Sequence, residues 1–236
     1  MSPGARRVAV LCAVALGAAW LLAGCDALGK VGAATHNPPA SQFTVSGRVT
    51  TVDVNGGGGS VDVTATARSN VSVSQQASYS GTAPTATHTL SGTTLTLSYR
   101  CPTELACSVS YVVQVPRGVA VTVSTAAGAV TLTSITGAVS ARADAGLITG
   151  VDLGSPTASF TSNAGGVVAG FSAAPRSVTA STNVGPITLT VPGTATYLVH
   201  THTLLGTSSV TVPVSGSAAH SISASSDVGS ISINPG

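Results

Sequence analysis

The fold is decided by residues 121–132, Val-Thr-Val-Ser-Thr-Ala-Ala-Gly-Ala-Val-Thr-Leu, in which apolar and hydroxyl side chains alternate on either side of Gly128. Alternation with a period of two predicts a strand with one buried face, and a glycine between two such runs predicts a tight turn. The same pattern recurs to the end of the chain, with a glycine at the same place in each copy. These glycines are Gly128, Gly146, Gly165, Gly185, Gly206 and Gly229.

The glycines of successive copies lie 18 to 23 residues apart, and the residues before them are also alike. Asp or Asn side chains hydrogen-bond to their own backbone in turns, and glycine accepts a positive φ. The copy around Gly206 departs from the pattern, because Thr201 replaces an apolar residue and Leu204 replaces the turn former. In four other copies the residue two places before the glycine is Asp144, Asn163, Asn183 or Asp227.

A unit of about 20 residues cannot bury a core alone, but stacked copies can. Parallel stacking in register would align one apolar position of every coil into an interior column. The sequence therefore predicts an all-β chain in which residues 117–236 form a parallel β-solenoid (β-helix) of about six coils. An antiparallel sandwich, whose strands also recur every 8–12 residues, is the alternative. The expected column consists of Val123, Ala141, Phe160, Ala180 and Ala224.

Residues 43–116 also alternate with a period of two, and we expect a smaller, partly antiparallel β region there. Cys101 and Cys107 continue the apolar faces of two successive strands in this region. In an oxidising compartment the favoured interpretation is a disulfide that staples the turn between the strands. A zinc pair is disfavoured because no histidine is near, and a redox pair because the spacing is not Cys-x-x-Cys.

The first 24 residues have the features of an export signal. Arg6 and Arg7 precede an apolar run over residues 8–22, which is short for a bilayer span. The run leads into Leu22-Ala23-Gly24-Cys25, which resembles the bacterial lipobox. The resemblance implies that residues 1–24 are a lipoprotein signal peptide and that Cys25 carries acyl chains. Ordinary secretion with a coincidental cysteine is the alternative.

Residues 25–42 contain Pro38 and Pro39 and show no periodicity, so we expect a linker between the lipidated N-terminus and the β body. Acyl chains on Cys25 would anchor the chain to the outer face of the bacterial cell membrane. This predicts an extracytoplasmic location.

From Leu95 to Gly236 the chain resembles the bacterial adhesin family that carries the domain label DUF4097. The resemblance is carried by the cysteine hairpin, by Val115-Pro116-Arg117-Gly118 at the end of a strand, and by repeats that close on Gly-x-Ile-x-Ile. It implies a β-solenoid that is anchored to a membrane or exported, and the family name implies adhesion.

Composition excludes some function classes. The chain has nine Lys and Arg residues against seven Asp and Glu, and two of the nine, Arg6 and Arg7, belong to the leader. The exported part is therefore balanced in charge, which argues against a nucleic-acid partner. The run Gly56–Gly59 lacks a lysine and a following helix pattern, so no phosphate-binding loop or cofactor is predicted.

A solenoid enzyme that acts on polysaccharides would need converging carboxylates. Asp144 and Asp152 could approach one another in adjoining turns, but beside Arg142 a surface ion pair is the favoured interpretation. We therefore predict no catalytic residues and no small-molecule substrate. Apart from those two, the acids after the leader are Asp26, Asp53, Asp62, Glu104 and Asp227.

His200 and His202 share one face of a predicted strand and could chelate a metal ion. No Cys, Asp or Glu lies within fifteen residues of them. Two imidazoles without a third ligand make a weak site. We therefore expect solvated histidines and no metal.

The expected function is that of a non-catalytic, adhesin-like surface protein that binds a macromolecular partner, either a surface glycan or a protein. The alternative is an envelope scaffold or regulatory protein-binding module, which a contiguous exposed apolar patch would favour. A solenoid enzyme is the third hypothesis. The outward hydroxyls expected to contact the partner are Thr122, Ser124, Thr131, Thr133, Thr179, Ser181, Thr188 and Thr190.

Overall fold

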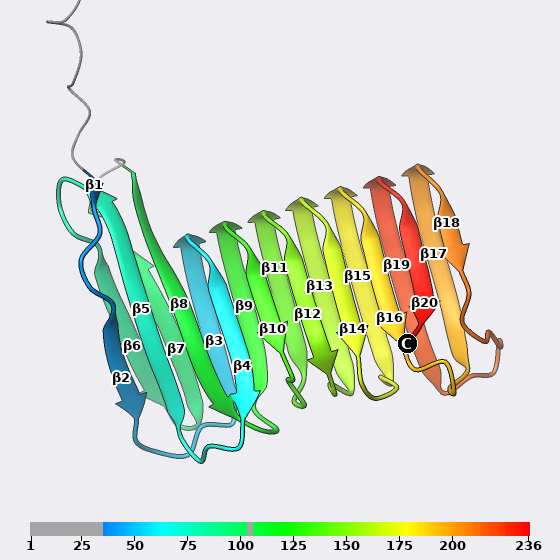
Figure 1. Cartoon of the computed structure of the whole chain (residues 1–236), viewed down its shortest axis with the longest axis horizontal. Helices are drawn as coiled ribbons and strands as arrows, with labels where there is room; N and C mark the ends of the chain where they lie inside the picture. The colour runs from blue at the N-terminus through cyan, green and yellow to red at the C-terminus, as the bar shows by residue number, and fades with distance from the viewer. Residues whose placement is uncertain (1–34, 103–105) are drawn as a thin grey trace, which may run out of the picture. The chain divides into compact units, whose positions relative to one another are not determined.

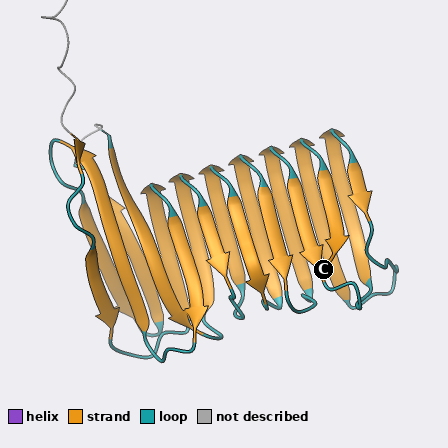
Figure 2. Ribbon diagram, in the orientation of Figure 1, coloured by secondary structure: helices purple, strands orange, loops and turns teal. Residues whose placement is uncertain are grey.

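The computed structural model describes residues 35–102 and 106–236, so the signal peptide, Cys25 and Glu104 lie outside the described residues. Thr35–Gly236 form one compact unit. All of its regular secondary structure, within the described ranges, consists of β-strands (Figure 2). No helix long and apolar enough to cross a membrane occurs in these ranges.

The unit is a stack of coils, each of which places one strand in each of two sheets (Figure 1). Neighbouring coils pair in parallel and in register. The predicted parallel β-solenoid is therefore confirmed, and the antiparallel sandwich is wrong for the repeats. Four successive coils are β9 (Ala120–Ala127) with β10 (Val130–Thr133), β11 (Val139–Ala145) with β12 (Ile148–Leu153), β13 (Thr157–Ala164) with β14 (Val167–Phe171), and β15 (Ser177–Val184) with β16 (Ile187–Val191).

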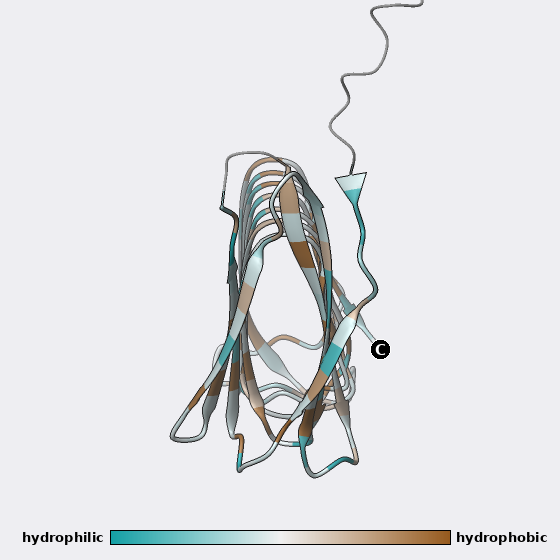
Figure 3. Cartoon of the chain, turned by 90° about the vertical axis from the view of Figure 1, so that its left-hand side faces the viewer, coloured by the Kyte–Doolittle hydropathy of each residue, from teal (hydrophilic) through white to brown (hydrophobic). Residues whose placement is uncertain are grey.

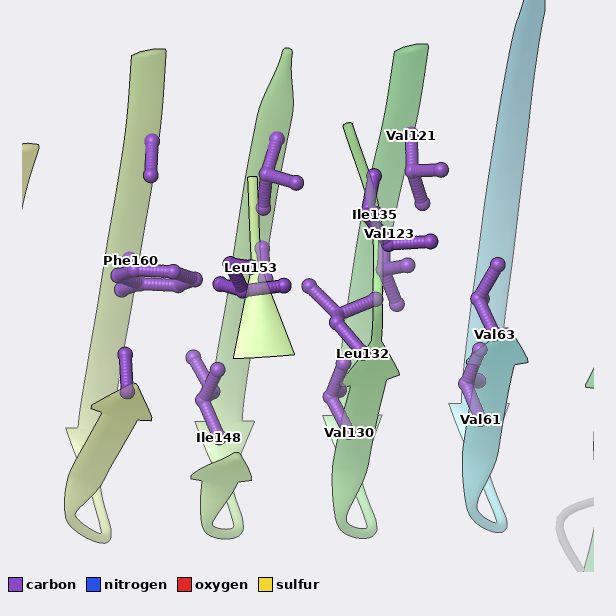
Figure 4. Packing of buried hydrophobic residues seen from close by; sticks show 14 of the residues in the cluster. Val61, Val63, Val121, Val123, Val130, Leu132, Ile135, Ile148, Leu153 and Phe160 are labelled. Carbon is purple, nitrogen blue, oxygen red and sulfur yellow. The ribbon is translucent and has the colours of Figure 1, made fainter. Parts of the chain in front are cut away.

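The two sheets face one another and enclose the core (Figure 3). We call the 11-stranded sheet, which contains β10 and β12, sheet A, and the 9-stranded sheet, which contains β9 and β11, sheet B. The register of sheet B aligns Val123, Ala141, Phe160, Ala180 and Ala224 in one column. Each of them is at most 2% exposed, which confirms the predicted interior column. Figure 4 shows part of this core.

The N-terminal end of the stack mixes parallel coils with antiparallel strands. The coil of β3 (Thr51–Gly58) and β4 (Val61–Thr66) lies between β9–β10 and the coil of β7 (Thr94–Arg100) and β8 (Cys107–Pro116). Both sheets therefore continue from the region of residues 43–116 into the repeats of residues 117–236. Four further strands pair antiparallel at this end. They are β1 (Thr35–His36), β2 (Ser41–Val45), β5 (Val71–Ser80) and β6 (Thr85–Ser91). Antiparallel pairing was expected within residues 43–116, but β1 and the start of β2 lie within residues 25–42, where a linker was expected.

At the C-terminal end the order of coils is not the order of the sequence. The last coil, β19 (His220–Val228) and β20 (Ile231–Pro235), pairs with β15–β16. The preceding coil, β17 (Tyr197–Leu205) and β18 (Ser208–Val210), lies outside it at the end of the stack (Figure 1). The irregular copy around Gly206 is thus the terminal coil.

The side chains explain this order. In the terminal coil the inward positions carry Thr201 and Thr203, which are half-buried. In the inserted coil the corresponding positions carry Ala224 and Ser226, both buried. Thr203 and Ser226 each donate to a glycine carbonyl of the neighbouring coil, so the two coils differ at Thr201 and Ala224. At the end of the stack the Thr201 hydroxyl keeps contact with water. The polar copy therefore suits the end of the stack.

Cysteine cross-linking will test the inserted order. Thr179 pairs with Ser223 on the neighbouring strand, and Ser223 pairs with His200 one strand further out. We expect Thr179→Cys with Ser223→Cys to form a disulfide under mild oxidation, because adjacent strands are about 4.8 Å apart. The matched pair Thr179→Cys with His200→Cys spans two strand spacings and should stay reduced. Peptide mapping that links residues 179 and 200 would contradict the order.

Tyr111 and Thr125 are buried residues whose side-chain hydroxyl has no hydrogen-bond partner among the described residues, and Tyr111 is the larger of the two. The Tyr111 side chain is fully buried. Burial raises the pKa of Tyr111 to about 12, and Tyr99 contributes a smaller increase. The neutral phenol is therefore favoured by the fold. Its contribution to stability is complete below about pH 10 and is lost as the pH rises through about 12.

Tyr111→Phe should stabilise the protein at pH 7 by about 1 kcal/mol, because it removes a buried hydroxyl without a partner. It should also reduce the loss of stability between pH 10 and 12. Urea unfolding at pH 7 measures the first effect, and urea unfolding at pH 10 and pH 12 measures the second. Tyr197→Phe is the matched control, since the Tyr197 hydroxyl donates to the Pro192 carbonyl at 3.0 Å and its loss should cost about 1 kcal/mol. Equal changes in stability for the two variants at pH 7 would contradict the difference in hydrogen bonding between the two hydroxyls.

Candidate functional site

The outer face of sheet B carries two columns of polar side chains that run the length of the stack. Strands in a sheet lie about 4.8 Å apart, so the side chains of each column are evenly spaced. We call this surface the hydroxyl face. One column contains Asp53, Thr122, Ser140, Ser159, Thr179, Ser223 and His200, and the other Asn55, Ser124, Arg142, Thr161, Ser181, Ser225 and His202.

The hydroxyls expected from the sequence divide between two faces. Those of β9 and β15 lie on the hydroxyl face, and those of β10 and β16 lie on the outer face of sheet A. On sheet A the column is interrupted by Val168, which stands between Thr149 and Thr188 and is 41% exposed. The longer uninterrupted polar surface is therefore on sheet B.

Hydrogen bonding on the hydroxyl face is sparse. The Ser181 hydroxyl donates to the Thr161 hydroxyl at 3.4 Å. Asp144, at the turn edge beside this face, accepts from Arg142 at 3.0 Å and from Asn163 at 2.9 Å. These groups leave most hydroxyls available to an outside partner. The face can donate and accept hydrogen bonds.

The described acids are spread over the unit rather than gathered. Asp53 lies on the outer face of sheet B and Asp62 on that of sheet A. Asp144 and Asp227 stand at the glycine turns, whereas Asp152 lies at the opposite end of β12. The suggested approach of Asp144 and Asp152 is therefore wrong. The reason is that β12 separates the two turns that hold them.

The structure also shows where the predicted histidines and cysteines lie. His200 and His202 lie exposed on the terminal strand β17, and no group of three metal-binding side chains occurs among the described residues. Cys101 and Cys107 form a disulfide with a Cα–Cα distance of 6.0 Å, which confirms the predicted bridge. It closes the connection between β7 in sheet B and β8 in sheet A. The expected cysteine hairpin is therefore wrong, because the two strands join opposite sheets and do not pair with one another.

The glycine turns carry a second surface, which we call the apolar ridge. It lies along the upper edge of the stack in Figure 1 and consists of exposed apolar residues that directly precede the glycines. Three of them expose large side chains, at 55% for Val184, 43% for Val228 and 67% for Leu205. The members of the ridge, in register, are Ala127, Ala145, Ala164, Val184, Val228 and Leu205.

A polar depression on the outer face of sheet A was not predicted. It has a volume of about 390 Å³, is open on one side, and is lined by residues of β2, β5, β8 and the segment before β5. Arg68 donates to the Gln114 side chain at 2.8 Å. No signal in the sequence connects these segments, because antiparallel pairing brings them together. The lining residues are Gln42, Arg68, Ser72, Ser74, Val112 and Gln114.

Comparisons with known proteins give a limited result. No family model and no curated protein matches the chain. A solved Clostridium sporogenes protein with a proposed role in cell adhesion is similar at 10% identity and a TM-score of 0.45, over 84% of this chain and 100% of that one. A Bacteroides fragilis protein proposed to be an adhesin is similar at 14% identity and a TM-score of 0.46, over 83% and 97%. Membership of the DUF4097 family stays a prediction.

Proposed function

We propose that this chain is an exported lipoprotein, anchored through Cys25 to the outer face of the bacterial cell membrane, which binds a macromolecular partner through the hydroxyl face without catalysis. The observation that carries the proposal is the pair of polar columns that crosses seven strands of sheet B. A parallel sheet presents such groups at a constant spacing and in a fixed orientation.

A long, hydroxyl-rich polymer is the partner that suits this surface best. Each hydrogen bond to such a partner contributes only about 1 kcal/mol after exchange with water. A regular array can make many of them at once, and binding at several points raises the overall affinity. The charge balance gives no reason to expect a strongly acidic or basic partner. We therefore propose a neutral surface glycan or cell-wall polymer.

The test compares two matched triple variants of the full chain. Ser159→Ala, Thr179→Val and Ser223→Ala remove hydroxyls from three neighbouring strands of the hydroxyl face. We expect this variant to lose at least about tenfold in affinity for glycans or isolated cell-wall polymer, since about 1 kcal/mol for each of three contacts exceeds a tenfold loss.

The control variant removes hydroxyls from the opposite face of the stack, on β12, β16 and β20. Thr149→Val, Thr188→Val and Ser232→Ala all lie on the outer face of sheet A. Its affinity should change less than about twofold, equivalent to under 0.5 kcal/mol. Equal losses in the two triple variants, or polymer binding by neither the variants nor the parent chain, would contradict the proposal.

The anchor is tested separately. Mass spectrometry of the N-terminal peptide from native membranes should show a chain that begins at Cys25 and carries acyl groups on it. A Cys25→Ser variant should be released from the membrane fraction. An unmodified Cys25 in the native protein would contradict the lipoprotein part of the proposal. It would not affect the binding proposal, which the triple variants test.

The apolar ridge supports a second candidate function, that of a scaffold or regulatory module with a protein ligand. Contiguous exposed apolar side chains mark protein-binding surfaces. Val184→Ser with Val228→Ser should then reduce photo-cross-linking of envelope proteins to this edge, while the sheet B triple variant should leave it unchanged. Loss of cross-linking in the sheet B variant alone would contradict a protein-binding site on the apolar ridge.

A further inference from the structure

The C-terminal end of the stack leaves a strand edge open in the described part of the chain. β17 is the last strand of sheet B, and its first residue alone has a bridge on the outer side. The N–H group of Tyr197 donates to the Pro213 carbonyl at 2.9 Å, and the Tyr197 carbonyl accepts from Ser215 N–H at 3.0 Å. An open edge of this kind is a template for another strand.

The direction of the remaining main-chain groups follows from Tyr197. Along a strand, the N–H and C=O groups of successive residues point alternately to the two neighbours. Val199, Thr201 and Thr203 therefore direct their N–H and C=O groups to the same open side as Tyr197. The side chains of His200 and His202, between them, lie on the outer face of the sheet and are exposed.

These histidines make half of a metal site. Residues two apart on a strand share a face, so their imidazoles can reach one ion. Tetrahedral zinc needs four ligands, and no third His, Cys, Asp or Glu joins the pair within the described residues. The neighbours on β19 are Ser223 and Ser225, which are uncharged. The site is therefore incomplete in a single copy.

We propose that His200 and His202 bind zinc together with the same two histidines of a second copy, paired antiparallel along β17. A two-fold axis at Thr201 places this residue opposite its own counterpart in a hydrogen-bonded pair. His200 then lies opposite His202 of the second copy, in a pair whose Cβ atoms are about 4.5–5.5 Å apart. All four imidazoles stand on one face, within reach of one ion.

The same register brings together two exposed apolar side chains at the C-terminal end of the stack. Leu205 is 67% exposed and Val214 is 55% exposed. Val214 occupies the edge beside Tyr197, so pairing between the two copies ends at Val199, and the residues of the second copy that follow Thr203 come up against Val214. Leu205 of each copy therefore meets Val214 of the other, at both ends of the pairing. Burial of these side chains would add to the zinc bonds.

Charge does not oppose the pairing. β17 has the sequence Tyr-Leu-Val-His-Thr-His-Thr-Leu-Leu and contains no Asp, Glu, Lys or Arg. Two copies can approach along it without like-charge repulsion. The pairing of only five edge residues is short, so the proposal assigns the decisive contribution to the metal. It does not depend on the function proposed for the hydroxyl face.

The experiment measures the mass of the full chain against zinc concentration. The chain, without a histidine tag, is studied in mild detergent by sedimentation velocity, with calorimetry for the zinc stoichiometry. We expect a monomer without zinc, a twofold increase of protein mass with zinc, and saturation at one zinc ion per two chains. Addition of EDTA should restore the monomer.

Single substitutions locate the site. His202→Ala should lower the apparent zinc affinity by at least about tenfold, because it removes two of the four ligands from the dimer. His36→Ala, at the opposite end of the chain's β unit, should behave like the parent. Binding of one zinc ion per monomer, a zinc-dependent dimer that His202→Ala leaves intact, or absence of zinc binding at millimolar concentration would each overturn the proposal.

Discussion

Gly185→Val is expected to destabilise the fold by more than about 3 kcal/mol, through backbone strain and a steric clash together. Gly185 has a φ of +148°, in the region that side chains with a Cβ rarely adopt. A Cβ at this position would also lie against the carbonyl group of Gly165 in the adjacent coil. The strain and the clash can be relieved only if the two paired coils move apart. Urea unfolding measures the loss.

Two further glycines separate strain from clash. Gly118 has a φ of +82° but open space around its Cβ position, and Gly216 has open space without an unusual φ. Gly118→Val should therefore cost only about 1–2 kcal/mol, and Gly216→Val should stay within about 0.5 kcal/mol of the parent. If all three valine variants are equally stable, the stacked glycine turns do not constrain the fold.

Phe160→Ala is expected to cost about 3–5 kcal/mol, because it empties a large volume in the middle of the core. The ring is fully buried, and its neighbours in the column are Ala141 and Ala180. These small residues leave room for the ring, and their backbones are fixed by the sheet, so the core cannot close around the cavity. Thermal or urea unfolding measures the cost.

A partner variant checks that the cavity is the cause. Ala141→Leu in the Phe160→Ala background should recover part of the lost stability, since it refills the adjacent volume. Val168→Ala, on the exposed face of β14, should cost less than about 1 kcal/mol. A cost for Phe160→Ala as small as that for Val168→Ala would mean that the column is loosely packed.

The repeats made the centre of the fold predictable. Val123, Ala141 and Phe160 stand at one place in a pattern that also fixes the glycines, so a single assumption of parallel stacking aligned all of them. Period-two alternation says which side chains are buried, and a shift by one residue would expose the whole set. Local sequence therefore determined the register of the interior coils.

The ends of the stack were harder to predict, because strand pairing there is non-local. β17 and β19 present similar inward faces, and either could pair with β15. The choice depends on the exposure of Thr201 in the finished stack, which no local pattern reveals. The place of the β3–β4 coil was hard to predict for the same reason. A long segment with antiparallel strands separates its glycine, Gly59, from the regular repeats in the sequence.

The candidate surfaces were predictable to different degrees. Outward hydroxyls follow from alternation, but the division between two opposite faces requires knowing which strand of each coil joins which sheet. The depression around Arg68 and Gln114 depends on antiparallel partners far apart in the sequence. The disulfide between Cys101 and Cys107 was predictable, because both cysteines border one short connection.

The inserted position of the final coil has a consequence for biosynthesis. Repeat proteins can in general grow by adding each unit to the one before it. Here residues 197–210 find no permanent neighbour when they emerge, because the place next to β15–β16 belongs to residues 220–236, which are made after them. The later segment must therefore insert between two earlier ones, and this part of the stack closes only after residue 236 has been made.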